Sequence, residues 1–570
     1  MNKELFGVFG DRDALQRFRS PEQFDVIVEG PTMAVGVRDS ALGTPGRSTV
    51  HETARGMAVV WGEAFVDGTT YEDPARLLVE TAGAGGRGVF DRLNGSFLAV
   101  VDLVDGPQVV VNDPIRSREC FYTDEPGVRV FGTDPATVAS VVDDPEVRSE
   151  PLMEFLIMGV VLGDRTILHG VDRVPFDAVV TAEATDSLAR FVYDPRKGNH
   201  ATELGERLSR ALERRAGYAG KKGLLLSSGC DSRTVLAGAP DIDVCYTIGT
   251  GTGDDIDGAK KIATQYDTPH ETLTVDDRYL NTCADVVQYS SAIWESVHIH
   301  HAGYVDQMDV DVIYHGGLGD SLFRGHFQPL DGIRLGGCRC PPYSVAENPN
   351  LSDYVSQTFG YIPIEEHLSV LDDDCSERFA CRRIRERLSD LSWRYDGSQN
   401  GLAAVGLENT PTLSFRAHLA DTFVESLVMA DAELLQWHLQ TPPSARSDET
   451  YVRALRTLDA DILRHRPPNL RFDSFTLSQL DAFLRQKLPL TKAYEGPWPD
   501  REVLYEKQDL DNKLLAGFPQ VHDLPWRLKL RINDLATWLE HATGEIGLTP
   551  TEMLQVDDRT AGCNGSLSPQ

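Results

Sequence analysis

The sequence lacks long hydrophobic runs. Its 570 residues contain no apolar stretch of about eighteen, the length that a transmembrane helix requires. The first residues, Met1–Leu5, do not lead into the apolar segment and cleavage site of a signal peptide. We therefore expect a cytoplasmic protein without a membrane partner.

Positive charge is scarce as well. Lys and Arg together number 55 against 87 Asp and Glu, which gives a net charge of -32. A broad basic surface for nucleic acid is therefore not expected. Only 11 of the basic residues are Lys, and the 54 Asp and 33 Glu are spread along the chain without forming an acidic tail. This pattern is typical of a halophilic protein, and a merely acidic soluble protein is the alternative.

The nine cysteines have no regular spacing. Cys338 with Cys340, and Cys375 with Cys381, do not match the usual patterns of zinc ligands. We expect reduced thiols with structural roles.

The sequence patterns predict two parts of the chain. The first part has short strand patterns separated by turn signals, at Met57–Trp61, Ser96–Asp102 and Val109–Asn112. The polar, turn-rich stretch Asp194–Asn199 then predicts a domain boundary. We expect domains at 1–195 and 200–570.

In the second part, apolar runs typical of buried strands alternate with helical patterns. This alternation predicts an α/β fold with a parallel sheet, and residues from about 350 to 550 read mostly as helix. The strand candidates are Gly223–Leu226, Val244–Ile248 and Val310–Tyr314, and the helix candidates are Glu203–Ala216, Thr234–Ala239 and Gly258–Tyr266.

A loop of small residues, Ser227–Ser232, separates the first of these strands from a helix. Backbone N–H groups at the start of a helix bind phosphate, and the serine hydroxyls add donors. Asp231 would repel phosphate unless a cation lies between them, which argues for Mg²⁺. The loop is not a Walker loop, because GxxxxGK[ST] is absent. Taken alone, it is also compatible with a tight turn and a helix cap.

Three motifs in the same order along the chain make the interpretation of this loop more specific. The stretch Ser227–Ser232 resembles the SGGxDS pyrophosphatase loop of the asparagine synthetase family. Tyr246–Gly249, followed by the acidic stretch Asp254–Ala259, resembles the family's next strand and turn. His315–His326 resembles its second turn, SGxGxDELFxGY. The resemblance covers roughly residues 200–470.

The resemblance implies an adenine nucleotide α-hydrolase-like domain that binds ATP and Mg²⁺. It implies contacts with the adenine for Leu225 and Ile248, and a place against the nucleotide for His315 and Gly316. Asp231 and Asp320 match the catalytic carboxylates that hold Mg²⁺ on pyrophosphate. The phosphate loop would consist of Ser227, Ser228, Gly229 and Ser232.

The chain also departs from the family's pattern. Gly317 stands where asparagine synthetases have Glu, and Ser321 replaces the acid that follows the second Asp. The family's late catalytic lysine has no clear counterpart, although Lys487 and Lys492 lie in roughly the right region. The sequence therefore leaves open whether the chain carries out the amide-forming half of the reaction.

The first part resembles class II glutaminase domains, which implies an Ntn-hydrolase-like α+β fold rich in strands. Leu93–Phe97 resembles LNGxF, Asn112–Arg116 resembles DxxG, and Phe131–Asp134 resembles the FASE turn. Phe6–Gly10 resembles the CGIxG start, with Phe6 in place of the nucleophilic Cys. Glutamine hydrolysis by these enzymes needs that thiol, so we expect a structural domain. An ordinary β-rich domain is the alternative.

Two further groups of residues need an interpretation. His298, His300 and His301 could bind a transition metal, but we favour polar residues that line the substrate cleft or face solvent. The basic stretch Arg464–Pro468 could meet a substrate carboxylate or phosphate, and a surface role fits it equally well.

Together these patterns predict an ATP-dependent, AMP-forming amide ligase that adenylates a carboxylate without hydrolysing glutamine. One alternative is asparagine synthesis from aspartate and free ammonia, and another is a non-catalytic ATP-binding or scaffolding protein. We expect small-molecule carboxylate and amine substrates as partners, leave a homodimer open, and expect no nucleic acid.

The dense carboxylates generate a prediction about salt. Like charges on a surface repel each other at low ionic strength, and salt screens that repulsion. The melting temperature should therefore rise from dilute buffer to molar KCl, as measured by circular dichroism at fixed pH. A melting temperature that is flat or falls with KCl would remove the halophilic interpretation.

Overall fold

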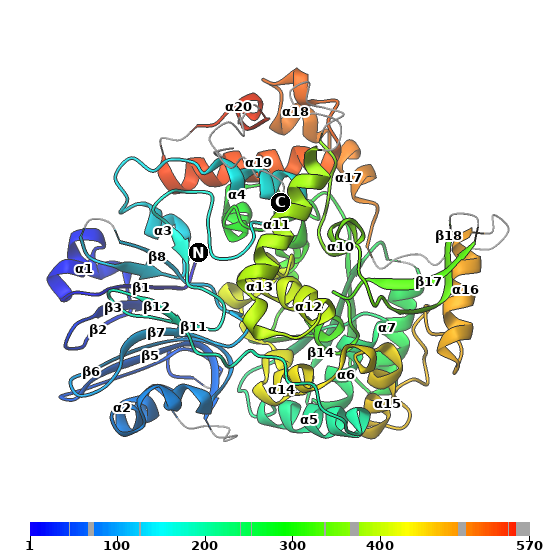
Figure 1. The fold of residues 1–570 in the computed structure, drawn as a ribbon, viewed down its shortest axis with the longest axis horizontal. Helices are drawn as coiled ribbons and strands as arrows, with labels where there is room; N and C mark the ends of the chain where they lie inside the picture. Colours follow the sequence, from blue (N-terminus) through cyan, green and yellow to red (C-terminus); the bar gives the residue numbers. More distant parts are fainter. Residues whose placement is uncertain are drawn as a thin grey trace, which may run out of the picture.

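The computed structural model describes residues 1–44, 46–66, 73–124, 127–239, 241–251, 253–335, 338–364, 375–487, 498–544 and 547–554. Figure 1 shows a strand-rich N-terminal part beside a larger part that mixes helices and strands. Within the described residues, no helix is both long enough and apolar enough to cross a membrane.

Two antiparallel sheets of six strands each form the N-terminal sandwich. The first has the order β10-β8-β9-β1-β3-β2 and the second the order β12-β11-β7-β6-β5-β4. The strands of the first sheet are β1 (Glu4–Val8), β2 (Val26–Glu29), β3 (Ala34–Arg38), β8 (Phe121–Thr123), β9 (Val130–Gly132) and β10 (Asp172–Arg173). Those of the second are β4 (Thr49–Thr53), β5 (Gly56–Val66), β6 (Leu93–Leu103), β7 (Gln108–Asn112), β11 (Ala178–Val180) and β12 (Thr185–Ser187).

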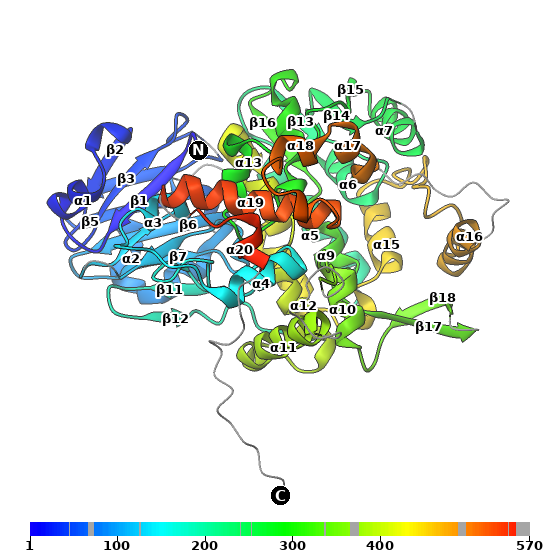
Figure 2. The same cartoon turned by 90° about the horizontal axis from the view of Figure 1, so that it is seen from above.

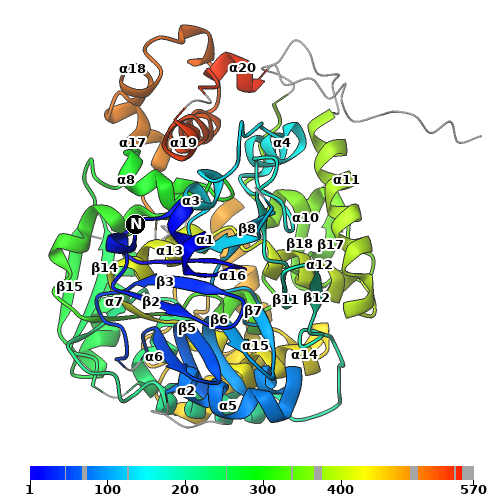
Figure 3. The same cartoon turned by 90° about the vertical axis from the view of Figure 1, so that its left-hand side faces the viewer.

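Alternation along the strands explains how the two sheets stack. On β5, Ala58 and Val60 pack in one cluster with Leu78 of helix α2 (Pro74–Gly85). Their neighbours Met57 and Val59 point to the opposite face and pack in a second cluster with residues of the first sheet. Helix α1 (Arg12–Phe18) covers the outer face of that sheet. The layers are therefore helix, sheet, sheet and helix, as Figure 3 shows, and the predicted fold of this part is confirmed.

The larger part is built on a parallel sheet of five strands in the order β15-β14-β13-β16-β19. The predicted parallel sheet is confirmed, and all three strand candidates belong to it. Its order reverses between β13 and β16, and open α/β sheets bind ligands at such a switch point, beyond the carboxyl ends of the strands. The strands are β13 (Lys222–Leu225), β14 (Val244–Gly249), β15 (His270–Thr274), β16 (Val312–His315) and β19 (Val424–Ser426).

Helices cover this sheet and join it to the rest of the chain. Helix α19 packs against α3 and α4, so the C-terminal region lies across the N-terminal part of the chain (Figure 2). The main helices are α3 (Pro135–Ala139), α4 (Ser149–Met158), α5 (His200–Arg214), α6 (Cys230–Gly238), α7 (Asp254–Gln265), α9 (Gly319–Phe323), α10 (Leu351–Thr358), α11 (Cys375–Asp390), α12 (Ser398–Glu408), α13 (Leu413–Thr422), α14 (Ala432–Gln440), α15 (Asp448–Leu458) and α19 (Trp526–Thr543).

One feature was not predicted from the sequence. A hairpin of β17 (Leu330–Leu335) and β18 (Cys338–Val345) packs against helix α16 (Phe475–Lys487) and projects from the molecule (Figure 1). No short run of alternating apolar residues marks these strands, and Pro341 and Pro342 would argue against one of them.

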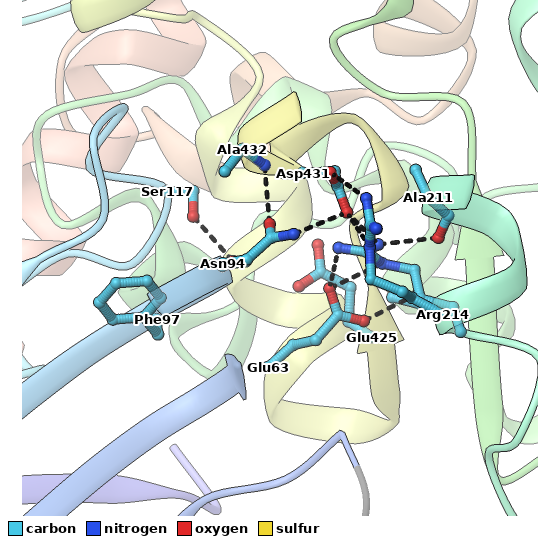
Figure 4. Close-up of polar contacts among 12 residues, drawn as sticks. Glu63, Asn94, Phe97, Ser117, Ala211, Arg214, Glu425, Asp431 and Ala432 are labelled. Carbon is cyan, nitrogen blue, oxygen red and sulfur yellow. Dashed lines mark hydrogen bonds and ion pairs between the residues drawn. The ribbon is translucent and has the colours of Figure 1, made fainter. Parts of the chain in front are cut away.

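The N-terminal sandwich and the parallel-sheet part meet through buried charges, shown in Figure 4. The Arg215 guanidinium donates to Glu63 of β5 and to Asp431 at the start of α14, both at 3.0 Å. All three side chains are fully buried. Asn94 of β6 donates to Asp431 at 3.1 Å and accepts from the N–H of Ala432 at 2.7 Å. A buried charge is tolerated when it is paired and hydrogen-bonded, so these contacts fix how the two parts sit together.

The interface therefore makes a prediction about stability. Arg215→Gln should lower the free energy of unfolding by about 3–5 kcal/mol, because it leaves the Glu63 carboxylate buried without its cation. The matched control is Arg210→Gln, earlier in the same helix. Arg210 pairs with Glu433, and its side chain is 46% exposed. That change should cost less than about 1 kcal/mol. Urea unfolding followed by circular dichroism measures both, and equal losses would contradict the role of Arg215.

Candidate active site

Hydrogen bonds that involve its own serines fix the conformation of the loop after β13. The Ser232 hydroxyl accepts from the N–H of Ser227 at 3.0 Å and lies 3.1 Å from the Ser227 hydroxyl. The Ser227 hydroxyl in turn accepts from the N–H of Gly229 at 3.2 Å. Helix α6 starts directly after this loop, so the N–H groups of its first turn face the carboxyl edge of the sheet. The predicted strand, loop and helix are therefore present in this order, an arrangement that can bind an anion.

Helix α7 fixes the other side of this loop. The Asp255 carboxylate accepts from the N–H of Ser228 at 2.9 Å and from its hydroxyl at 2.5 Å. A Cβ on Gly258 would lie 2.6 Å from the Cβ of Ser228, so only glycine allows this close approach. Asp255 belongs to the acidic stretch noted in the sequence, but its bonds to the loop were not predicted.

A buried arginine supports the loop from behind. Arg233 is 0% exposed and donates to the carbonyl oxygens of Ser228 at 2.5 Å and Gly229 at 2.9 Å. It also donates to the carbonyls of Ile462 at 3.0 Å and His465 at 2.7 Å. The stretch at 464–468 therefore reaches the loop through a backbone oxygen, whereas the side chain of Arg464 is exposed.

The second glycine-rich turn comes from β16 and lies against the first. A Cβ on Gly316 would meet the carbonyl carbon of Asp231 at 2.6 Å, and one on Gly319 would meet its Oδ1 at 2.7 Å. Leu318, between them, has a left-handed backbone with φ of 71°. The two turns of the sequence motif are therefore in direct contact at the switch point of the sheet.

This contact brings together the two carboxylates predicted to hold Mg²⁺. Asp231 Oδ2 accepts from Arg324 at 3.0 Å, while Asp231 Oδ1 is buried and has no hydrogen-bond partner. Asp320 is half-exposed and accepts from the N–H of Ser321 at 2.7 Å. Burial, together with the charge of Asp320, raises the pKa of Asp231 to about 6 against the charge of Arg324 and a hydrogen bond from Tyr451.

Mg²⁺ fits this pair of carboxylates. The ion is usually bound by one or two carboxylates together with substrate phosphates and waters. The Oδ1 of Asp231 has no hydrogen-bond partner and is available as a ligand atom. Burial is the main cause of the raised pKa of Asp231, and the charge of Asp320 adds to it. Among the described residues no group of three metal-ligating side chains occurs, so phosphate oxygens and water would complete the shell.

Arg324 was not singled out from the sequence, although it lies inside the second motif. It donates to Asp231 and, at 2.6 Å, to Asp448 at the start of α15. Burial would lower its pKa, but the charges of Asp231 and Asp448 raise it well above the usual range. A permanent cation therefore stands beside the predicted phosphate loop.

His315 is anchored on both ring nitrogens. Its Nδ1 accepts from the N–H of Gly317 at 3.1 Å, which leaves Nε2 to donate to Glu425 of β19 at 3.0 Å. Burial would raise the pKa of Glu425, but Arg416 and Arg118 hold it well below its usual range. Arg118 belongs to the N-terminal sandwich, so the position of His315 depends on both parts of the chain.

The remaining predicted nucleotide contacts form an apolar wall. Leu225 at the end of β13 and Ile248 on β14 are partly buried and pack against a cluster that includes Tyr246 and Leu273. Phe415 of α13 packs against the same cluster. These positions suit an adenine ring.

Of the three histidines that follow Trp294, His300 and His301 are buried and His298 is partly buried. His300 stacks on Tyr279 with 5.1 Å between the ring centroids, and His301 Nε2 lies 2.9 Å from His418 Nδ1. Burial lowers the pKa of His300 to about 3, and that of His418 to about 4. They are neutral rings within an aromatic cluster, and His298 lies 3.7 Å from Glu295.

Of the two candidates for the family's late catalytic lysine, one lies within the described residues. Lys487 is the last residue of α16 and is exposed. Lys492 lies outside the described residues.

The N-terminal motifs have structural contacts. Phe6 is 0% exposed within β1 and packs with Val8 and Leu15. Arg116, at the glycine position of DxxG, has a φ of 48°. Its guanidinium donates to Asp164 at 2.9 Å and to the carbonyl of Glu408 in the larger part at 3.1 Å.

The switch-point site places the Asp231 carboxylate between the loop after β13 and the second glycine-rich turn. Residues 203–465 match the family described as asparagine synthase. No curated protein matches the sequence.

Two solved structures are weakly similar. The glutamine phosphoribosylpyrophosphate amidotransferase from B. subtilis, complexed with ADP and GMP, is 9% identical with a TM-score of 0.20, and the match covers 47% of this chain and 65% of that one. The structure titled the allosteric regulatory enzyme of purine biosynthesis is 10% identical with a TM-score of 0.21, and the match covers 56% and 75%. Neither score carries an argument about this chain.

The raised pKa of Asp231 predicts a pH-dependent metal site. Its carboxylate is protonated below about 6, so the ligand is lost as pH falls through that value. With Mn²⁺ as a spectroscopic substitute, the dissociation constant from electron paramagnetic resonance should rise about tenfold per pH unit below 6. Asp231→Asn and Asp320→Asn should each weaken binding at pH 7.5 by about tenfold or more.

The matched control is Asp257→Asn, an exposed carboxylate on α7, which should bind Mn²⁺ as the unchanged protein does. An affinity that stays constant from pH 7.5 to 5 would contradict the assignment of Asp231.

Proposed function

We propose that this protein is an ATP-dependent ligase that adenylates a carboxylate substrate, releases pyrophosphate and passes the acyl group to an amine without hydrolysing glutamine. The single observation that carries the proposal is the buried, unpartnered Oδ1 of Asp231, placed against Gly319 at the start of α9 and beside the phosphate loop. A carboxylate left open there suits a metal-bound leaving group.

The chain's own residues suggest how the pyrophosphate is held. The N–H groups at the start of α6 and the hydroxyls of Ser227 and Ser232 are donors for phosphate oxygens. Asp255 and Arg233 keep that loop in place from two sides. Mg²⁺, when bound by Asp231 and Asp320, would neutralise the charge that develops on the leaving group.

The support for an amine other than glutamine-derived ammonia lies in the N-terminal sandwich. Phe6 offers no thiol and is buried. Cys120, the nearest cysteine downstream, is 0% exposed, and burial raises the pKa of its thiol far above the usual range. A thiolate is the nucleophile in such chemistry. Asn94, within the LNGxF-like segment, is bonded to Asp431 and Ala432 and is committed to the interface (Figure 4).

Gly317 bears on the amide-forming half of the reaction. It has no side chain to act as the base that activates ammonia, which weighs against ordinary asparagine synthesis. A free amine that carries its own base would not need one from this position. A non-catalytic role would be favoured only by the pairing of Asp231 with Arg324, which partly satisfies that carboxylate.

The test is ATP–pyrophosphate exchange across a panel of carboxylic acids, with glutamine and glutamate assayed in parallel. We expect exchange with at least one acid, its loss by about a hundredfold or more in Asp320→Asn, and no change in Asp257→Asn. No glutamate should form from glutamine, with or without aspartate.

Each other outcome selects an alternative. Exchange confined to aspartate, with amide formed from free ammonia, would identify asparagine synthesis. ATP binding without exchange for any acid would identify the scaffolding protein. Glutamate released in step with AMP would overturn the claim that the glutaminase is lost.

A further inference from the structure

A cavity of 520 Å³ lies between the β17–β18 hairpin, helix α16 and the first residues of helices α7 and α15. The hairpin is held against α16 by the N–H of Tyr343, which donates to Gln479 at 3.1 Å. A single water needs on the order of 10–15 Å³ of such space, and pockets for drug-sized ligands measure about 300–1,000 Å³. The cavity therefore has room for a ligand larger than a single amino acid.

The inner end of the cavity adjoins the candidate active site. Asp448 lines the cavity and accepts from Arg324 Nε at 2.6 Å, and Arg324 Nη1 donates to Asp231 at 3.0 Å. Asp254 also lines the cavity and directly precedes Asp255, which holds the phosphate loop. A ligand in the cavity would therefore lie beside the loop and the turn that are proposed to hold the nucleotide.

Two charges on the wall have no ion-pair partner in the described part of the chain. Of the five charged side chains that line the cavity, Asp448 pairs with an arginine outside it, and Asp481 pairs with Arg485 at 2.9 Å. The other two are Asp254, at the inner end, and Arg471, in the stretch before α16. The wall thus offers one carboxylate and one guanidinium, which suits a ligand that carries both an ammonium and a carboxylate.

The remaining wall of the cavity suits a peptide. Apolar side chains come from the hairpin, from α16 and from the stretch before it, and amide side chains lie among them. A peptide can bury an apolar side chain there and hydrogen-bond the amides with its backbone, whereas an acyl chain would leave those amides without partners. The apolar residues are Leu330, Tyr343, Leu470, Phe475 and Phe483, and the amides are Asn469, Gln479 and Gln486.

The hairpin adds a backbone edge to this wall. Its sheet has two strands, so within the described residues the outer edge of β17 pairs with no further strand. An extended peptide can add to such an edge as another strand. Leu330 of β17 lines the cavity, and the side chains of Leu330 and Ile333 are 41% and 54% exposed. The strand therefore continues the apolar wall beyond the cavity itself.

We propose that this cavity binds a peptide, with the amino-terminal ammonium toward Asp254 and a carboxylate toward Arg471. The inference rests on the proposed function, because it names the amine substrate of the ligase as the amino group of a peptide. In that transfer the nitrogen forms a bond to the acyl carbon, and the bond from that carbon to the phosphate oxygen breaks. AMP leaves with the electron pair, and the two protons that the nitrogen loses pass to water.

Binding is tested without ATP, by isothermal calorimetry with the full-length protein at pH 7 and constant ionic strength. The probes are the tripeptide Gly-Leu-Phe, its amino-acetylated form, its carboxyl-amidated form, free leucine and octanoate. We expect saturable binding of the tripeptide and no saturation with leucine or octanoate. Each modified form should bind about fivefold or more weakly, because it lacks one of the two charges.

Two variants identify the partners of these charges. Asp254→Asn should weaken binding of the unmodified tripeptide by about fivefold or more and leave that of the acetylated form unchanged. Arg471→Gln should weaken the unmodified tripeptide as much and leave the amidated form unchanged. The matched controls are Asp257→Asn on the same helix as Asp254, and Arg464→Gln. Both side chains are exposed and lie outside the cavity wall, so these variants should bind every probe as the unchanged protein does.

A second measurement tests the role as substrate. With ATP, Mg²⁺ and an acid that supports pyrophosphate exchange, the tripeptide should yield AMP and an amide with the mass of acid plus tripeptide minus water. Exchange without tripeptide binding would keep the proposed function and overturn this inference. Tripeptide binding without exchange would support the peptide site and contradict the proposed function.

Three further results would overturn the peptide site. The first is that leucine or octanoate binds as tightly as the tripeptide. The second is that Asp254→Asn and Arg471→Gln both bind the tripeptide as the unchanged protein does. The third is sedimentation that shows a second copy of the chain in the cavity, excluding the tripeptide.

Discussion

The close approach of the two glycine turns at the switch point of the parallel sheet is the constraint on which the candidate active site depends. Gly316 and Gly319 leave no room for a Cβ against Asp231. Any larger residue would push α9 away from α6 and separate the carboxylates of Asp231 and Asp320. Catalytic groups must be placed to within well under about 1 Å of their working positions. The two glycines therefore contribute to the chemistry by fixing these positions, without contacting a substrate.

The rest of the molecule supports this contact through arginines whose charges are buried. Arg233 holds the phosphate loop, Arg215 joins the two parts of the chain, and Arg416 fixes Glu425 behind His315. A guanidinium suits such places because it stays charged and donates in several directions at once. The abundance of Arg over Lys in this acidic chain therefore reflects the interior as well as the surface.

The sequence predicted the elements that carry motifs, and it missed the contacts between them. The strands near Leu225, Ile248 and His315 and the loop at Ser227 could be predicted because apolar runs and small residues mark them locally. The roles of Arg233 and Arg324 depend on the carbonyl of His465 and on Asp448, which lie far along the chain, and no local pattern encodes such pairs. The hairpin at 330–345 was missed because its prolines oppose a strand.

The Asp231 carboxylate combines an ion pair with an open ligand position. Its Oδ2 is paired with Arg324, whereas its Oδ1 is buried without a hydrogen-bond partner and lies near a second acid. A buried polar atom without a partner costs free energy, and a bound cation would offset that cost. The switch point is therefore a position where a cation would stabilise this fold as well as serve the reaction.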